Sequence, residues 1–236
     1  MIKVENIEVF NFEGAIRGMR NPLNSWDKSD SKNGCCKPSN YTEHVSCDDC
    51  PYSEIAVPCK PYYQIGKNDL DLMHRLFVAG AEHRKYLRQI FVSMDITAPT
   101  YWIAELDTYK VGTTRNSCSF MHRGLSKPFE ISDFSTHTEG ADLSTITDNA
   151  FDAVINVLNE LREVYLKTNS DIVFQQIRCL LPSGYNQRFT LTMTYENVFN
   201  IINQRQNHRL SEWRELCEIL KDLPYVREIG GINDGE

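Results

Sequence analysis

Apolar and polar residues alternate most regularly between residues 188 and 194. Every second residue from Phe189 to Met193 is apolar, and threonines lie between them, which predicts a strand with one buried face. From Tyr195 the apolar spacing changes to three and four, which predicts a helix directly after the strand. Asn200 and Arg205 lie on or beside the edge of this helix, and such a strand-helix unit commonly forms a ligand site.

The same two periods predict further elements along the chain. Residues 2–10 alternate and predict a strand, whereas residues 92–96 fit a strand or a helix equally well. Helical spacing predicts five more segments. They are a helix capped by Asn68, an amphipathic run from Glu82, a helix opened by Ala98-Pro99, a long helix from Thr147 or Asp148, and a final helix after Trp213.

Two segments are predicted to be loops. Residues 124–146 are polar and rich in turn-forming residues. Residues 14–29 combine glycines, arginines and Asn21-Pro22, which is typical of a surface loop. An alternative is that Arg17 or Arg20 of this loop meets an anion while Trp26 stacks on a ring.

The predicted elements define an α+β fold, with a central, mostly antiparallel sheet and helices packed on it. A chain of 236 residues is long enough for a buried core, and we expect a single domain over residues 1–236. The net charge of −7 argues against a partner that is a nucleic-acid polymer. No stretch approaches the ~20 apolar residues that span a bilayer, so we expect no membrane contact and a cytoplasmic location.

Residues 32–62 are poor in apolar residues and hold five of the eight cysteines, which predicts a Cys-rich insertion. Cys47 and Cys50 have the C-x-x-C spacing that grips one metal ion. Cys36 and Cys59 complete a structural four-thiolate zinc site in this interpretation, with Cys35 or His44 as substitutes. The alternatives are free thiols or a redox pair.

Cys118 is a candidate nucleophile, because a thiol needs a nearby cation or base to lower its pKa. Arg115, His122 and Arg123 are close to it in sequence. The alternative is a buried cysteine in a core helix.

The stretch around the opening strand resembles the C-terminal signature of the flavin-dependent thymidylate synthases, the ThyX family. The matching pieces are Leu181-Pro182, Gln187 to Met193, Asn200 to Arg205, and Trp213. Arg178 falls where the family carries an arginine that binds nucleotide. The resemblance covers roughly residues 82–222.

The central region is similar to the family's Arg-His-Arg-x-x-Ser flavin motif when Ala98-Pro99 is set on the family's Ala-Pro-type turn. Glu105 then falls on a glutamine that contacts nucleotide phosphate, and residues 108–110 fall on Arg-His-Arg. Lys110 keeps a cation and Thr113 keeps a hydroxyl. The two lost arginines remove bidentate phosphate donors, which a lysine does not replace.

The resemblance implies an enzyme that binds FAD and dUMP in a homotetramer. It would pass a methylene group from methylenetetrahydrofolate to the pyrimidine, with NADPH as reductant. Site residues follow by role. They are Arg205 and Cys118 for catalysis, Lys110, Thr113 and Asn200 for the flavin, and Glu105, Arg178 and Arg205 for the nucleotide.

Two other functions remain open on the sequence alone. The altered central motif favours a relative that kept the fold but modifies or binds a different nucleotide. The cysteine cluster favours a zinc-stabilised interaction protein, although such a protein does not need the polar strand-helix stretch.

Overall fold

The computed structural model describes residues 2–34, 62–136 and 144–232. The chain divides into two compact units. Unit 1 contains Met1–Glu8, Val92–Met193 and Asn200–Ile219, and unit 2 contains Val9–Phe91, Thr194–Phe199 and Leu220–Glu236. The single domain over residues 1–236 stays a prediction.

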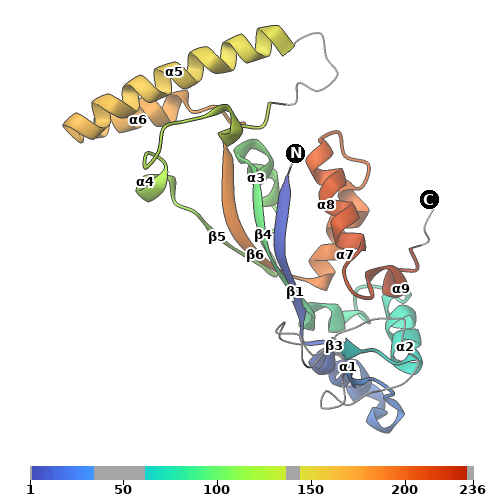
Figure 1. The fold of residues 1–236 in the computed structure, drawn as a ribbon. Helices are drawn as coiled ribbons and strands as arrows, with labels where there is room; N and C mark the ends of the chain where they lie inside the picture. The colour runs from blue at the N-terminus through green and yellow to red at the C-terminus, as the bar shows by residue number, and fades with distance from the viewer. Residues whose placement is uncertain (1, 35–61, 137–143, 233–236) are drawn as a thin grey trace, which may run out of the picture. The chain divides into compact units, whose positions relative to one another are not determined.

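Unit 1 holds most of a four-stranded antiparallel sheet, with the strand order β1-β4-β6-β5 (Figure 1). The strands are β1 Lys3–Phe10, β4 Phe91–Pro99, β5 Thr113–Ser117 and β6 Asn186–Thr194. Arg115 of β5 lies opposite Leu191 of β6. The predicted α+β fold class is confirmed, and residues 92–96 are strand rather than helix.

One face of this sheet forms the main core of unit 1. Val92, Met94 and Ile96 of β4 are fully buried, and the residues between them are half-buried. The helices α3 Thr100–Leu106 and α8 Ser211–Lys221 lie beside the sheet, with the C-terminal half of α7 Tyr195–Arg205 (Figure 1). Trp102 and Trp213 from two of these helices pack with ring centroids 4.7 Å apart.

A second apolar cluster in unit 1 joins two helices to the chain that follows β5. These elements are α4 Phe120–Arg123, η5 Ile131–Asp133, α5 Ser144–Thr168 and α6 Asp171–Leu180. Leu158 and Ile177 are fully buried between α5 and α6, together with phenylalanines from residues 120–134. The long helix α5 is confirmed, whereas α6 and β5 were not predicted.

Unit 2 is mostly helical. Its elements are α1 Phe12–Arg20, η1 Asn21–Leu23, η2 Trp26–Lys28, β2 Lys32–Gly34, β3 Tyr62–Gln64, α2 Lys67–Val78, η4 Lys85–Gln89 and α9 Val226–Gly230. Strand β2 pairs antiparallel with β3. Asp69 and Arg20 form a buried ion pair, with Arg20 Nε 2.6 Å from Asp69 Oδ1.

The predicted loop over residues 14–29 is wrong in its first half, which is the helix α1. Buried residues at helical spacing form its core face, although the glycines at 14 and 18 are among the residues that favoured a loop. Gly18 instead allows close packing, because a Cβ there would lie 2.3 Å from Gln89 Oε1. The anion role for Arg20 is wrong as well, because its guanidinium is buried against Asp69.

Two smaller predictions in unit 2 are also wrong. Asn68 lies inside α2, and Gly66 occupies the cap position. The amphipathic run from Glu82 is not an α-helix but a short 3-10 helix, η4, followed by β4. Among the described residues, none of the helices is both long and apolar enough to cross a membrane.

Candidate functional site

Glu105, near the C-terminal end of α3, is the centre of a polar cluster in unit 1. Its Oε2 accepts a hydrogen bond from Trp213 Nε1 at 2.9 Å. The same oxygen lies 3.2 Å from Arg205 Nη1 and forms an ion pair with it. Two segments about 100 residues apart in sequence therefore meet at one carboxylate.

Arg205, the last residue of α7, is held on several sides. Its Nε donates to the Tyr109 hydroxyl at 3.0 Å, and that hydroxyl donates to Gln204 Oε1 at 2.9 Å. The guanidinium carbon lies 4.7 Å from the centre of the Trp213 ring. The hydrogen bonds and the stacking on Trp213 together fix the guanidinium, so it is oriented without a ligand.

His208 lies beside the same carboxylate. Its Nδ1 accepts a hydrogen bond from the backbone N–H of Leu210 at 3.2 Å, so a neutral ring carries its hydrogen on Nε2. This Nε2 is 3.7 Å from Glu105 Oε2, which is within ion-pair range when the ring is protonated.

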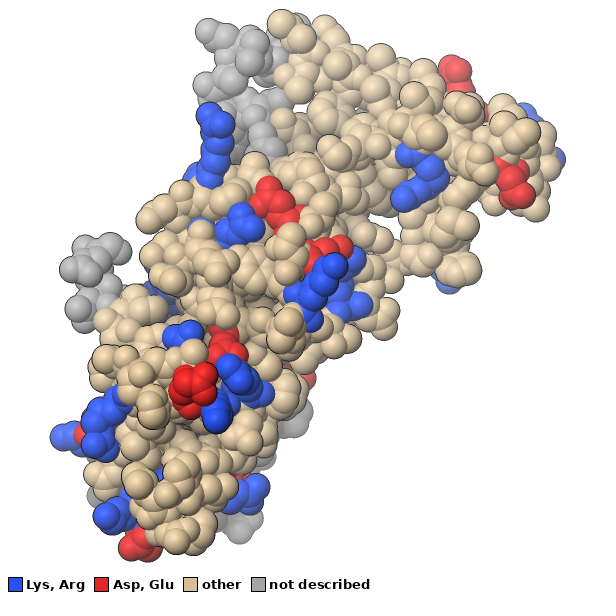
Figure 2. Space-filling view, turned by 180° about the vertical axis from the view of Figure 1, so that it is seen from behind, with Lys and Arg blue, Asp and Glu red and all other residues tan. Residues whose placement is uncertain are grey.

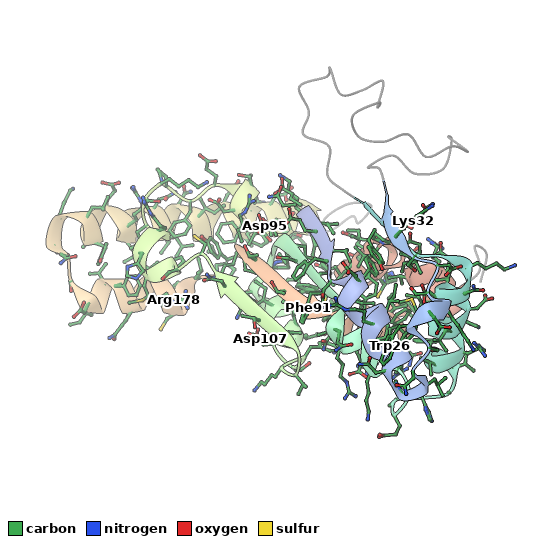
Figure 3. All side chains as sticks on the ribbon, turned by 90° about the horizontal axis from the view of Figure 1, so that it is seen from below. Trp26, Lys32, Phe91, Asp95, Asp107 and Arg178 are labelled. Carbon is green, nitrogen blue, oxygen red and sulfur yellow. The ribbon has the colours of Figure 1, made fainter. Side chains whose placement is uncertain are left out.

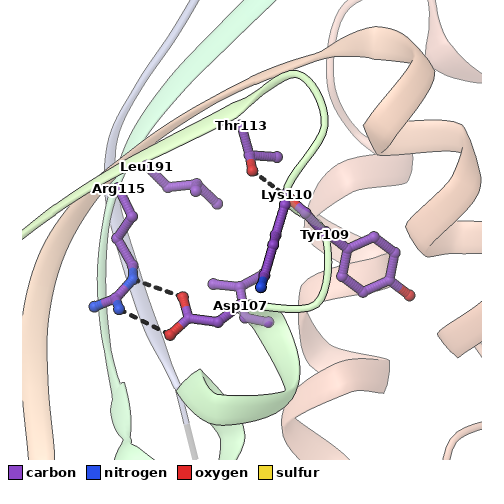
Figure 4. A pocket seen from close by; sticks show the side chains of 7 residues that line it. Asp107, Tyr109, Lys110, Thr113, Arg115 and Leu191 are labelled. Carbon is purple, nitrogen blue, oxygen red and sulfur yellow. Dashed lines mark hydrogen bonds and ion pairs between the residues drawn. The ribbon is translucent and has the colours of Figure 1, made fainter.

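A cavity of about 400 Å³ lies next to this cluster (Figure 4). It is lined by Leu106, Asp107, Tyr109, Lys110, Thr113, Arg115 and Leu191. Asp107 holds Arg115 through two hydrogen bonds of 3.0 and 2.9 Å, and the Thr113 hydroxyl donates to the Tyr109 carbonyl. The lining combines paired charges with apolar side chains.

Lys110 differs from the other cations near the cavity. Figure 2 shows acidic and basic side chains next to each other on the face seen there. Arg115, which lines the cavity, is paired with Asp107 at 2.9 Å. Within the part of the chain that the structure describes, Lys110 has no ion-pair partner. Its ammonium group is therefore available to an anionic group of a ligand.

The other predicted site residues lie elsewhere in unit 1. Cys118 is exposed just after β5, so the alternative of a buried core cysteine is wrong. The exposed Arg178 of α6 stacks on the Phe120 ring, with its guanidinium carbon 4.8 Å from the ring centre. Burial and, after it, the charge of Asp133 raise the pKa of Tyr185 above its ordinary value.

Most of strand β5 lies between Thr113, at the cavity, and Cys118. Thr113 begins the strand and Cys118 follows its end, and five residues at about 3.3 Å each span about 17 Å. Figure 3 shows Asp107 and Arg178 near opposite ends of β5. The structure thus brings Glu105 and Arg205 together, with Lys110 and Thr113 in the adjacent cavity, but leaves Cys118 and Arg178 apart from them.

Asn200 is half-buried on α7, five residues before Arg205, and does not line the cavity. Arg115, one of the three cations or bases close to Cys118 in sequence, is bound to Asp107. The proposed zinc ligands Cys36, Cys47, Cys50 and Cys59 lie outside the described residues. Within residues 2–34, 62–136 and 144–232, no group of three or more His, Cys, Asp or Glu is placed to hold a metal.

Sequence reasoning missed Gln204, His208 and Asp107 as members of this region. It also treated Tyr109 only as a replacement in a motif, whereas Tyr109 contacts Arg205 directly. The contacting residues are 96 positions apart, and no periodic pattern within one sequence reports such a contact.

The fold is similar to that of solved thymidylate synthases. A crystal structure of thymidylate synthase X (ThyX) from Helicobacter pylori with FAD and dUMP aligns with a TM-score of 0.64 at 15% identity, covering 98% of this chain and 97% of that one. A second structure of the Helicobacter pylori flavin-dependent enzyme, complexed with FAD and dUMP, aligns with a TM-score of 0.60 at 15% identity and covers 97% of both chains.

The chain therefore has the fold of these ThyX structures. The family described as thymidylate synthase complementing protein matches residues 71–224, and the chain belongs to this family. Among curated proteins, none shows a significant match to the chain.

Proposed function

We propose that this chain is a flavin-dependent enzyme that acts on a pyrimidine deoxynucleotide, with dUMP as the first candidate. The observation that carries the proposal is the pre-oriented Arg205, held by Glu105 and by Tyr109, a residue that also lines the cavity. Arg205 belongs to the stretch that resembles the family signature. Membership of the family and the FAD and dUMP in the Helicobacter pylori structures support the same ligand classes here.

The residues at the cavity fit part of a flavin cofactor. Lys110, which has no ion-pair partner among the described residues, offers a cation for a phosphate group, while Leu106 and Leu191 offer apolar surface for a ring. Thr113 and Asn200 are further candidates for flavin contacts. When bound, FAD would supply hydride transfer, with NADPH as the reductant and methylenetetrahydrofolate as the one-carbon donor.

The role that we assign to Arg205 is electrostatic. Negative charge develops on a pyrimidine ring oxygen when a nucleophile attacks the ring, and a fixed cation stabilises that charge without reorganising. The bonds from Arg205 to Glu105 and Tyr109 supply this fixed orientation. Arg178 and the thiol of Cys118 remain a proposed nucleotide contact and a proposed nucleophile, and neither residue lines the cavity.

A second candidate function is favoured by the ion pair between Glu105 and Arg205. The carboxylate neutralises the cation that a nucleotide phosphate would need, which fits a family member that modifies or binds a different nucleotide. The interpretation as a zinc-stabilised interaction protein depends on cysteines outside the described residues. We further propose a homotetramer, following the resemblance.

The test is dUMP-dependent oxidation of NADPH with FAD and methylenetetrahydrofolate present, with the nucleotide product identified by mass spectrometry. We expect thymidylate as product and a loss of about 100-fold in kcat/KM for Arg205→Ala, the usual effect of removing one charge-stabilising group. The control is Arg209→Ala, which removes an exposed arginine four residues after Arg205, beyond the end of α7. Equal turnover by Arg205→Ala and the parent protein would contradict the role of Arg205.

A further inference from the structure

Glu105 places a negative charge 3.2 Å from Arg205, the residue that the proposed function assigns to the pyrimidine nucleotide. We propose that Glu105 is a specificity-determining residue that removes the preference of this site for a phosphate dianion. The site then accepts a pyrimidine nucleoside as well as it accepts the nucleoside monophosphate. This inference rests on the proposed pyrimidine site and names its ligand class more closely.

The charges of the polar cluster at Glu105 and of the adjacent cavity carry the first step of this inference. Arg205 is paired with Glu105 at 3.2 Å, and Arg115 is paired with Asp107 at 2.9 Å. Among the described residues that line the cavity, Lys110 is the cation without such a partner. A phosphate dianion that approached Arg205 would meet the Glu105 carboxylate within contact distance of the same guanidinium, and like charges repel.

Glu105 is held in place, which excludes the interpretation that a phosphate simply pushes it aside. Its Oε2 is the acceptor for the indole N–H of Trp213, a residue with 0% exposure. Moving the carboxylate would leave this buried donor without an acceptor, which is unfavourable. Glu105 is therefore a fixed part of the site.

The second carboxylate oxygen of Glu105, Oε1, indicates which kind of ligand group can bind next to it. The contacts from Arg205, Trp213 and His208 all reach Oε2. Within the described part of the chain, Oε1 has no hydrogen-bond partner, and the side chain is 37% exposed. An open carboxylate oxygen accepts an N–H or O–H group, which a pyrimidine ring or a sugar supplies and an ionised phosphate does not.

The test compares equilibrium binding of dUMP and of deoxyuridine to the FAD-loaded protein by calorimetry. For the parent protein we expect dissociation constants within about threefold of each other, since phosphate adds little affinity beside a carboxylate. Glu105→Gln keeps the shape of the side chain and an acceptor for Trp213. It should raise the affinity for dUMP relative to deoxyuridine by about tenfold, because the repulsion of the phosphate is lost while both ligands meet the same amide NH2 group at the open position.

Glu160→Gln is the matched control, because it removes the same charge from an exposed position on α5. Binding of dUMP by the parent protein at least about tenfold tighter than deoxyuridine would overturn the inference while leaving the proposed function in place. That comparison needs no variant, so it holds even if Glu105→Gln fails to fold. Absence of binding by both ligands would overturn the inference and the pyrimidine site together.

Discussion

The buried carboxylate of Asp69 joins three segments of unit 2 through hydrogen bonds. Its carboxylate, with 0% side-chain exposure, accepts hydrogen bonds from Arg20 Nε at 2.6 Å and from the Ser29 and Ser31 hydroxyls at 2.7 and 2.6 Å. Burial acts to raise the pKa of Asp69, but these hydrogen bonds outweigh it and lower the pKa below its ordinary value. The carboxylate thus stays ionised and fixes the chain on both sides of it.

Replacing Arg20 tests this arrangement. Arg20→Ala leaves the buried Asp69 without its cation and should lower the free energy of unfolding by about 3–5 kcal/mol. Urea denaturation measures the change. Arg17→Ala, on the same helix but 70% exposed, should change it by less than about 0.5 kcal/mol. Equal effects of the two substitutions would show that the buried pair is not a stabilising feature.

Asp95 on β4 gives a prediction about pH. Hydrogen bonds from Thr190, Asn6 and Arg188 lower its pKa to about 2. Because the folded pKa is depressed, this stabilisation is present above the unfolded value of about 3.9 and is lost as the pH falls toward 2. Carbon NMR of the carboxyl group should show a midpoint near 2 that rises in Thr190→Val, and a midpoint near 3.9 in the parent protein would contradict it.

Among the elements, α2 begins with a cap that no local sequence signal reveals. Asp30, 38 residues before Asn68, accepts hydrogen bonds from the backbone N–H groups of Asn68 at 2.9 Å and Asp69 at 3.2 Å. We predicted Asn68 as the cap because capping is usually local in sequence. The start of a helix can be recognised from spacing, but a cap supplied by a distant segment cannot.

Removal of the Asp30 side chain tests how much this cap stabilises α2. Asp30→Ala should destabilise unit 2 by about 1 kcal/mol, the usual cost of losing an N-cap side chain. Hydrogen exchange in the first turn of α2 should speed up as well. Asp27→Ala, an exposed aspartate three residues earlier, should leave both measurements unchanged.

The pair α5 and α6 provides a matched comparison of two isoleucines on one helix. Ile177 is fully buried, whereas Ile172 is 71% exposed. Ile177→Ala should lower the free energy of unfolding by about 2–5 kcal/mol, because it removes buried methyl groups and leaves a cavity. Ile172→Ala should have an effect below about 0.5 kcal/mol in the same urea titration.

Elements with one-sided burial are the ones that the sequence predicts well. β6 and α7 follow the change of period at Tyr195, and α5 follows its long helical spacing. β5 was missed because its residues Thr113–Ser117 are polar and none is fully buried, so they carry no apolar alternation. Helix α1 was missed because its two glycines serve packing rather than a turn.

For the whole molecule, sequence identifies the family stretch but not the arrangement of the site. Glu105 and Arg205 were both predicted to contact nucleotide, and the structure shows that they contact each other. Cys118 and Arg205 were both predicted to be catalytic, yet β5 places about 17 Å between Cys118 and Thr113, which lines the cavity together with Tyr109, the contact of Arg205. Contacts between distant segments decide these points, and a single sequence does not contain them.

The central claim is that the chain binds a flavin, and the absorbance spectrum of the purified protein tests it most directly. We expect flavin bands, release of FAD on denaturation, and FAD affinity about tenfold weaker in Lys110→Ala, since one charged contact to phosphate is lost. Lys221→Ala, at the end of α8 and outside the cavity lining, is the control. A colourless protein that takes up no added FAD would contradict the account.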